Sequence, residues 1–124
     1  MKNKIFIAED DFLLARLYQR AFEAGGYDTD FARDGVEALA KLKEMTIKPN
    51  VLLVDILMPR MDGLELLKEI KKTPGIKDIP VVVFTNVTEE KEEKEAMSLG
   101  ALKYLLKGEM DIKDVISEID SLMK

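Results

Sequence analysis

Short apolar runs alternate with longer amphipathic segments along the whole chain. Most of the apolar runs are rich in valine, isoleucine and leucine, which is typical of strands that are covered on both faces, as in a parallel sheet. The segments between them repeat apolar residues at helical spacing, which indicates helices that pack on one side. The predicted strands are Lys4–Ala8, Tyr27–Ala32, Val51–Val54, Pro80–Phe84 and Lys103–Leu106. The predicted helices are Phe12–Ala24, Gly35–Met45, Gly63–Lys72, Thr88–Leu99 and Asp111–Met123.

This alternation predicts a single α/β domain over residues 1–124, with a parallel sheet that carries helices on both faces. The helix at Thr88–Leu99 has the weakest apolar face, because its opening, TEEKEEKE, is polar throughout. In sheets of this kind, ligands bind beyond the carboxyl ends of the strands. The residues that follow each strand are therefore the first candidates for a functional site.

Acidic, hydroxyl or lysine side chains directly follow the first, third, fourth and fifth predicted strands. Glu9 and Asp10 follow the first strand, Asp55 follows the third, Thr85 the fourth and Lys107 the fifth. If the first and third strands are neighbours, their carboxylates converge, and two like charges about 4 Å apart repel by roughly 4 kcal/mol at an effective dielectric constant of about 20. A divalent cation would offset that repulsion, and Mg²⁺ suits coordination by oxygen atoms alone. The pattern therefore predicts a magnesium site at the carboxyl edge of the sheet.

Each of these residues also has a purely structural interpretation. An acid after a strand is often the cap of the next helix, which is the alternative for Asp11 and, less strongly, for Asp10. Asp55 alone could cap a turn, Thr85 could be a structural hydroxyl and Lys107 a solvated surface charge. Because these side chains all occur at strand ends on the expected binding edge, a shared functional site is the better explanation.

Composition narrows the chemistry that such a site can perform. The 24 acidic and 19 basic residues give a net charge of −5, which argues against binding nucleic acid through bulk charge. The chain has no cysteine and no histidine, so the site must use carboxylates, hydroxyls, lysines and a hard, oxygen-bound metal. The opening, MKNKIFIAEDD, has too few apolar residues for a signal peptide, and no segment approaches the length of a membrane span. We therefore expect a cytoplasmic protein with no direct nucleic-acid or membrane partner.

Four stretches, IFIAEDD, VLLVDILMPRMDG, VVVFTN and GALKYLLKG, carry a resemblance to a known family. Over essentially its whole length, the chain resembles the receiver domain of bacterial two-component response regulators, of the chemotaxis-regulator-like kind. The pattern D-x-x-M-P-x-M-D-G, which starts at Asp55, is the most specific part of that resemblance. The resemblance implies a flavodoxin-like (βα)5 three-layer sandwich, in which the five parallel strands have the order 2-1-3-4-5.

The resemblance also implies a phosphoacceptor and a metal site. Asp55 would accept a phosphoryl group from a histidine kinase or a phosphotransfer protein, in a reaction that depends on Mg²⁺. Asp10 and Asp55 would bind the metal directly, Glu9 would act through a water, and the backbone carbonyl of Leu57 would be the remaining protein ligand. By this resemblance the protein is a signalling protein rather than an enzyme, because it assists only its own phosphorylation and dephosphorylation.

Three further residues would connect the acceptor to a distant surface. By the resemblance, Thr85 would hydrogen-bond one phosphoryl oxygen and Lys107 would pair with another, while Tyr104 would change rotamer on activation. Because phosphorylation adds negative charge, we expect Thr85 to be drawn inward and Tyr104 to fill the space that it leaves. The reshaped surface would be roughly Thr88–Met123, which would bind an unidentified effector. We expect a monomer, with a dimer through this surface as an option for the phosphorylated form.

The chain departs from the family pattern at three positions. Gly108 follows Lys107 where the family usually has proline, and since a cis bond before a non-proline residue costs about 2.5–4 kcal/mol, we expect a trans bond there. Asn86 stands where a small residue is usual, and Phe12 stands where proline commonly opens the first helix. None of these changes removes a chemical group that phosphoryl transfer needs.

Other classes of protein share parts of this pattern. A phosphatase with an aspartate nucleophile needs a second acid two residues after it, and that position is Leu57. A flavodoxin-like cofactor binder needs a phosphate-cradling loop after the first strand, where the acids of this chain would repel phosphate. A pseudo-receiver, which folds but is not phosphorylated and serves only as an interaction module, is the remaining alternative. Binding of Mg²⁺ and of the phosphate mimic beryllofluoride would separate it from a working receiver.

Overall fold

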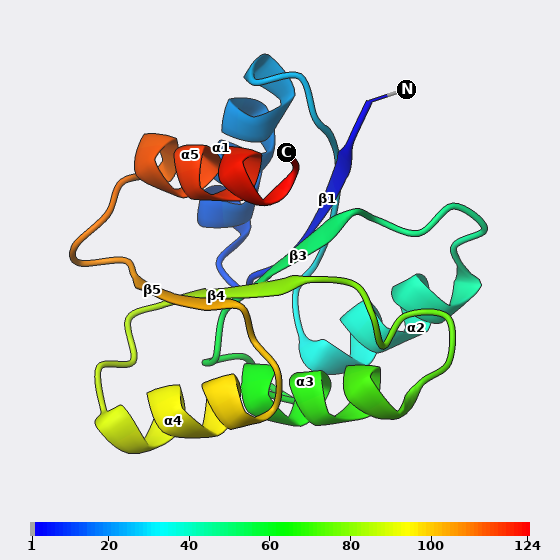
Figure 1. The fold of residues 1–124 in the computed structure, drawn as a ribbon, viewed down its shortest axis with the longest axis vertical. Helices are drawn as coiled ribbons and strands as arrows, with labels where there is room; N and C mark the ends of the chain where they lie inside the picture. Colours follow the sequence, from blue (N-terminus) through cyan, green and yellow to red (C-terminus); the bar gives the residue numbers. More distant parts are fainter. Residues whose placement is uncertain (1) are drawn as a thin grey trace.

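The computed structural model describes residues 2–124 and shows strands and helices in strict alternation (Figure 1). The strands are β1 (Lys4–Ala8), β2 (Asp28–Ala32), β3 (Val51–Val54), β4 (Val81–Thr85) and β5 (Lys103–Leu106). The helices are α1 (Phe12–Ala24), α2 (Gly35–Glu44), α3 (Gly63–Lys72), α4 (Glu90–Ser98) and α5 (Ile112–Leu122). None of the helices between residues 2 and 124 is long and apolar enough to cross a membrane.

All strands are parallel and have the order β2-β1-β3-β4-β5, which confirms the predicted flavodoxin-like topology. Helices α1 and α5 cover one face of the sheet, and α2, α3 and α4 cover the other, so the molecule has three layers (Figure 1). Strand β1 lies between β2 and β3, with Ala8 opposite Val54. Because both of these residues end their strands, the segments that follow β1 and β3 leave the sheet side by side.

The apolar runs of the central strands supply both cores. Along β1, Phe6 points into the core beneath α2, α3 and α4, whereas Ile5 and Ile7 point into the core beneath α1 and α5. Every residue of β3 and β4 is buried, as expected for strands that are covered on both faces. The helices bury one stripe each, and α4 buries only Ala96 among its nine residues. Helix α4 is therefore held by fewer apolar contacts than its neighbours, as its polar sequence predicts.

Strands β1, β3 and β5 and helices α1 and α3 have the predicted bounds, whereas the bounds of the other elements differ from the predictions by one or two residues. Strand β2 begins at Asp28 because the N–H of Tyr27 still donates to the Phe22 carbonyl in the turn after α1. Strand β4 extends to Thr85, which pairs with Leu106 of β5. Helix α4 begins at Glu90, two residues later than predicted, and its N-cap makes no side-chain hydrogen bond. Without a capping side chain, the first polar residues of the predicted helix remain outside it.

Candidate functional site

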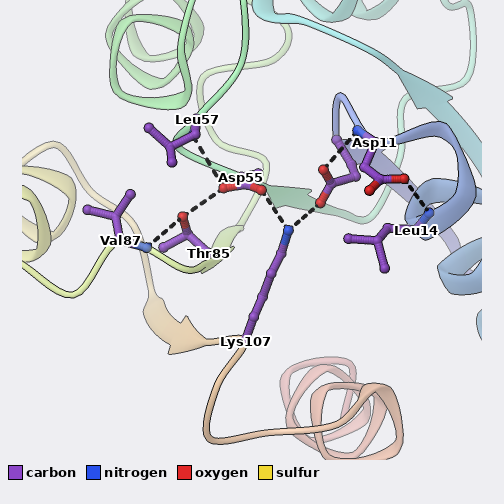
Figure 2. Close-up of polar contacts among 8 residues, drawn as sticks. Asp11, Leu14, Asp55, Leu57, Thr85, Val87 and Lys107 are labelled. Carbon is purple, nitrogen blue, oxygen red and sulfur yellow. Dashed lines mark hydrogen bonds and ion pairs between the residues drawn. The ribbon is translucent and has the colours of Figure 1, made fainter.

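The residues that follow the strands converge at the carboxyl edge of the sheet. Glu9 comes directly after β1, Asp55 directly after β3, Thr85 ends β4 and Lys107 comes directly after β5. Figure 2 shows the side chains of Asp55, Thr85 and Lys107 pointing toward one another from these different elements. Asp55 is only 7% exposed, Glu9 2% and Thr85 0%, so the carboxylates and the hydroxyl lie beneath the surface. The structure therefore brings together the polar groups that the sequence placed at separate strand ends.

Lys107 joins the two buried carboxylates. Its Nζ lies 2.6 Å from Glu9 Oε1 and 2.7 Å from Asp55 Oδ2. Burial lowers the pKa of Lys107, but the hydrogen bonds to Asp55 and Glu9 outweigh it, so the pKa lies above its ordinary value. Burial raises the pKa of Glu9 to about 7, against the lowering effect of the hydrogen bond from Lys107. Burial and the neighbouring charge of Asp55 thus disfavour the charged form of Glu9 despite the ammonium, and a further cation would favour it.

Asp55 receives hydrogen bonds on both of its oxygens. The Thr85 hydroxyl donates to Oδ1 at 2.7 Å, and the backbone N–H of Leu57 donates to the same atom at 3.3 Å (Figure 2). Lys107 donates to Oδ2 at 2.7 Å. The carboxylate is consequently fixed in orientation, and a hydroxyl and an ammonium stand within reach of any group that becomes attached to it. Thr85 already contacts Asp55 here, so the inward shift expected from the sequence would start from this contact.

Three carboxylates fit a site for a hard divalent cation. Glu9, Asp10 and Asp55 can each offer one oxygen within 4.8 Å of the others. Asp10 is exposed, whereas the other two are buried. An all-oxygen donor set of this size and charge suits Mg²⁺, which keeps several waters and takes one or two carboxylates from the protein. Leu57 lies on the loop that follows Asp55, and the assignment of its carbonyl as a ligand remains a prediction.

Asp11 contacts this cluster through its backbone N–H, which donates to Glu9 Oε2 at 3.1 Å, whereas its side chain has a structural role. Its Oδ1 accepts a hydrogen bond from the N–H of Leu14 at 3.1 Å, and it is the N-cap of α1 (Figure 2). The helix-cap interpretation of the acid run is thus confirmed for Asp11. Asn86 is exposed, and the bond between Lys107 and Gly108 is trans, as expected for a residue other than proline.

Tyr104 is connected to the site through the backbone of a single residue. The Tyr104 hydroxyl donates to the carbonyl of Val87 at 2.8 Å, and the N–H of Val87 donates to the Thr85 Oγ1 at 3.3 Å. Burial, together with the charges of Glu93 and Glu92 on α4, raises the pKa of Tyr104 to about 12. The sequence indicated Thr85 and Tyr104 but not this bridge, because backbone groups of Val87 leave no residue-type signal. Its position two residues after Thr85 was the available clue.

Comparison with known proteins places the chain in a family. Residues 5–120 match the family model described as the response regulator receiver domain. The chain is 32% identical over 98% of its length to the transcriptional regulatory protein CpxR homolog of Haemophilus influenzae, of which it covers 51%. The curated relatives are longer proteins, and the chain spans about half of their length or less.

Solved structures agree with the sequence comparison. The phosphorylated cyanobacterial phytochrome response regulator RcpA superposes with a TM-score of 0.84 at 29% identity, over 98% of this chain and 91% of that one. The Mn²⁺-bound form of the response regulator Rcp1 superposes with a TM-score of 0.81 at 31% identity, over 97% of this chain and 91% of that one. With the family model matched along nearly the whole chain, this protein belongs to the response regulator receiver domain family.

Proposed function

We propose that the chain receives a phosphoryl group on Asp55 from a histidine kinase or a phosphotransfer protein, and that this event changes a surface that binds an effector. The observation that carries the proposal is the contact set of Asp55. A buried carboxylate with a hydroxyl at 2.7 Å on one oxygen and an ammonium at 2.7 Å on the other stands beside two further acids. Burying such a cluster costs free energy of folding, so stability alone does not explain it and a functional role is favoured.

The proposed transfer is a displacement at phosphorus. A carboxylate oxygen of Asp55 forms a new bond to phosphorus while the bond from phosphorus to the donor's imidazole nitrogen breaks, and that nitrogen leaves with its electron pair and takes up a proton. When bound at Glu9, Asp10 and Asp55, Mg²⁺ would supply the positive charge that offsets the meeting of two anions. Lys107 would donate to one phosphoryl oxygen and Thr85 to another, since each already donates to the acceptor.

The signal would then travel from Thr85 to Tyr104. When the Thr85 hydroxyl turns toward a phosphoryl oxygen, the contact between its Oγ1 and the N–H of Val87 changes, and the Val87 carbonyl that holds Tyr104 moves with it. Tyr104 lies on β5 beside α4, so the surface made by α4, β5 and α5 is where we propose that the effector binds. The solved relatives described as phosphorylated and Mn²⁺-bound support the same chemistry by analogy.

Binding of beryllofluoride tests this proposal without a kinase. In the presence of Mg²⁺, beryllofluoride should shift the backbone amide resonances of Asp55, Thr85 and Lys107 and change amide exchange within Thr88–Met123. Asp55→Asn, which removes the attacking carboxylate, should show neither response. A change confined to Asp34–Met45 would contradict the proposed output surface. No response of the parent at any site would favour the alternative, an interaction module that is not phosphorylated.

A further inference from the structure

The loop between β3 and α3 is held in an unusual backbone conformation next to Asp55. Among residues 2–124, Arg60 is the one non-glycine residue with a positive φ, at 64°. The N–H of Met61 donates to the carbonyl of Pro59 at 2.7 Å, which closes a γ-turn around Arg60. A γ-turn with a positive central φ is rare and strained, and such strain persists only where the surroundings hold it in place.

The start of α2 provides those surroundings. Arg60 places Nε 3.0 Å and Nη2 2.8 Å from the same oxygen of Asp34, Oδ2. Next to this pair, the N–H of Gly35 donates to the Met61 carbonyl at 2.9 Å. A Cβ on Gly35 would lie 2.5 Å from the Met61 carbonyl oxygen, so only glycine allows the two backbones to approach this closely. The γ-turn is therefore docked on the N-terminus of α2.

Asp34 is well suited to hold this contact. It is only 7% exposed, and its other oxygen, Oδ1, accepts from the N–H of Glu37 at 2.8 Å as the N-cap of α2. Burial raises the pKa of Asp34, but the hydrogen bonds from Glu37 and Arg60 outweigh it and hold the pKa below its ordinary value. Asp34 is consequently a carboxylate near neutral pH, with one oxygen committed to the helix and the other to the loop.

The docked turn is continuous with the proposed metal site. At the far end of the loop, the N–H of Gly63 donates to the Ile56 carbonyl at 2.8 Å. A Cβ on Gly63 would lie 2.2 Å from the Asp55 carbonyl oxygen, so this end is also tightly packed. Leu57 lies between these anchors, and its N–H contacts Asp55 Oδ1. The backbone at Leu57 therefore has little freedom while both anchors of the loop are in place.

We propose that Asp34 and Arg60 are positioning residues for the metal site: they hold the β3–α3 loop so that the Leu57 carbonyl and the Asp55 carboxylate keep the spacing that Mg²⁺ requires. The proposal rests on the proposed function, because it concerns the same ion. Mg²⁺ tolerates little departure from octahedral geometry, so a loosened loop should weaken its binding. Through this contact, the N-terminus of α2 would set the affinity for the ion from outside the site.

The direction in which Mg²⁺ affinity changes when Arg60 is replaced distinguishes a positioning role from a simple electrostatic effect. Arg60 is a cation on the loop that follows Asp55, so removing its charge should by electrostatics alone strengthen Mg²⁺ binding. Loss of positioning predicts the opposite, weaker binding. Arg60→Gly is the sharpest variant, because glycine adopts a positive φ without strain and the fold should remain intact. Arg60→Asn serves as a second variant, because asparagine tolerates a positive φ better than most residues.

Titration of Mg²⁺ into the protein, followed by calorimetry and by backbone amide shifts, provides the measurement. We expect the dissociation constant for Mg²⁺ to rise about threefold to tenfold in Arg60→Gly, which is at or below the smallest cost that is typical when residues supporting metal ligands are lost. Asp34→Asn should weaken binding as well, and Asp34→Asn combined with Arg60→Gly should be no weaker than the worse single variant. The exposed Arg33, which precedes Asp34, supplies the matched control: Arg33→Gln should leave the constant unchanged.

Thermal unfolding without Mg²⁺ completes the test. The unfolding midpoint of Arg60→Gly should stay close to that of the parent, because the strain that is relieved offsets the contact that is lost. Mg²⁺ binding by both Arg60→Gly and Arg60→Asn that is equal to or tighter than that of the parent would overturn the positioning role. A parent that fails to bind Mg²⁺ would instead contradict the proposed function, so the two failures are distinguishable.

Discussion

The two edges of the sheet use polar groups in opposite ways. At the amino edge, the Tyr27 hydroxyl donates to Asp120 Oδ1 at 2.6 Å, which ties the turn before β2 to the end of α5. At the carboxyl edge, the buried carboxylates of Glu9 and Asp55 share the single ammonium of Lys107. At the amino edge, one hydroxyl donor therefore meets one solvent-exposed carboxylate. At the carboxyl edge, two buried carboxyl groups share one ammonium.

This difference between the two edges suggests that the amino edge contributes mainly to stability and the carboxyl edge mainly to the proposed function. A neutral donor that meets an exposed carboxylate gains a hydrogen bond at little desolvation cost. Burying two carboxylates with one ammonium is expensive, which supports the proposed functional role of this cluster. Substitutions at the carboxyl edge should therefore remove function and spare stability, and substitutions at the amino edge should do the reverse.

The largest effect is expected at the acceptor. Asp55→Asn or Asp55→Ala should lower phosphorylation by acetyl phosphate more than about 100-fold, because the attacking oxygen is gone. The free energy of unfolding should change by no more than about 1 kcal/mol, since Glu9 still neutralises Lys107. Intact-protein mass spectrometry measures the phosphoryl group, and urea unfolding measures stability. Phosphate retained at normal stoichiometry in either variant would rule out Asp55 as the acceptor.

The next effect concerns the exposed acid of the carboxyl edge. Asp10→Asn should raise the dissociation constant for Mg²⁺ by roughly tenfold or more, because loss of a direct ligand should cost at least as much as loss of its support. The neighbouring variant Asp11→Asn removes the same charge but keeps the cap of α1, because asparagine is an equally good N-cap. It should bind Mg²⁺ nearly as the parent does. If metal titration of Asp10→Asn matches that of the parent, the assignment of Asp10 is wrong.

At the amino edge, the expected result is a loss of stability alone. Tyr27→Phe removes the hydroxyl that Asp120 accepts and should lower the free energy of unfolding by roughly 1.5 kcal/mol. Mg²⁺ affinity and phosphorylation should stay at the parent values, because the change lies at the opposite end of the sheet from the site. Asp120→Asn, which keeps an oxygen acceptor, should cost less than Tyr27→Phe. Altered phosphorylation in Tyr27→Phe would break the separation between the two edges.

Much of this arrangement could be predicted from local sequence patterns. Strands β1 and β3 were predicted with the boundaries that the structure has, because their apolar runs end abruptly at charged residues. The topology of a parallel sheet then brings the residues after those strands to one edge, so the cluster of Glu9 and Asp55 follows from order along the chain. The start of α4 was predicted two residues early, since a polar sequence without a capping side chain carries no sharp boundary signal.

Contacts that depend on the packing of loops could not be predicted in this way. The pair of Asp34 and Arg60 forms because the N-terminus of α2 meets the β3–α3 loop, and neither residue type indicates its partner. The bridge from Thr85 to Tyr104 runs through backbone groups of Val87, which every residue except proline would supply. Residue types in the sequence indicate possible chemistry. Contacts between loops, and hydrogen bonds through backbone groups, can be identified only from the three-dimensional structure.

The smallest expected effect also lies at the carboxyl edge. It concerns how long the phosphoryl group remains on Asp55. Leu57 is 62% exposed, and it lines one groove of about 460 Å³ together with Asn86 and Val87. Neither Leu57 nor Val87 can orient a water by a side-chain hydrogen bond, and Glu9, the buried acid nearby, is held by Lys107 at 2.6 Å. We therefore predict that the phosphorylated form is long-lived for its family, which suits a slow output.

The decay half-life after removal of the donor, measured by intact-protein mass spectrometry, tests this prediction. Leu57→Asn and Val87→Glu should each shorten it by about threefold to tenfold, a small part of what a well-placed general base can supply. Val87→Glu is informative because the contacts of Val87 with Thr85 and Tyr104 are made by its backbone and survive the change. Val87→Ile, which stays apolar, is the control and should decay as the parent does. Unchanged decay in both polar variants, or a parent as short-lived as the fast chemotaxis regulators, would refute the shielding role of the two apolar side chains.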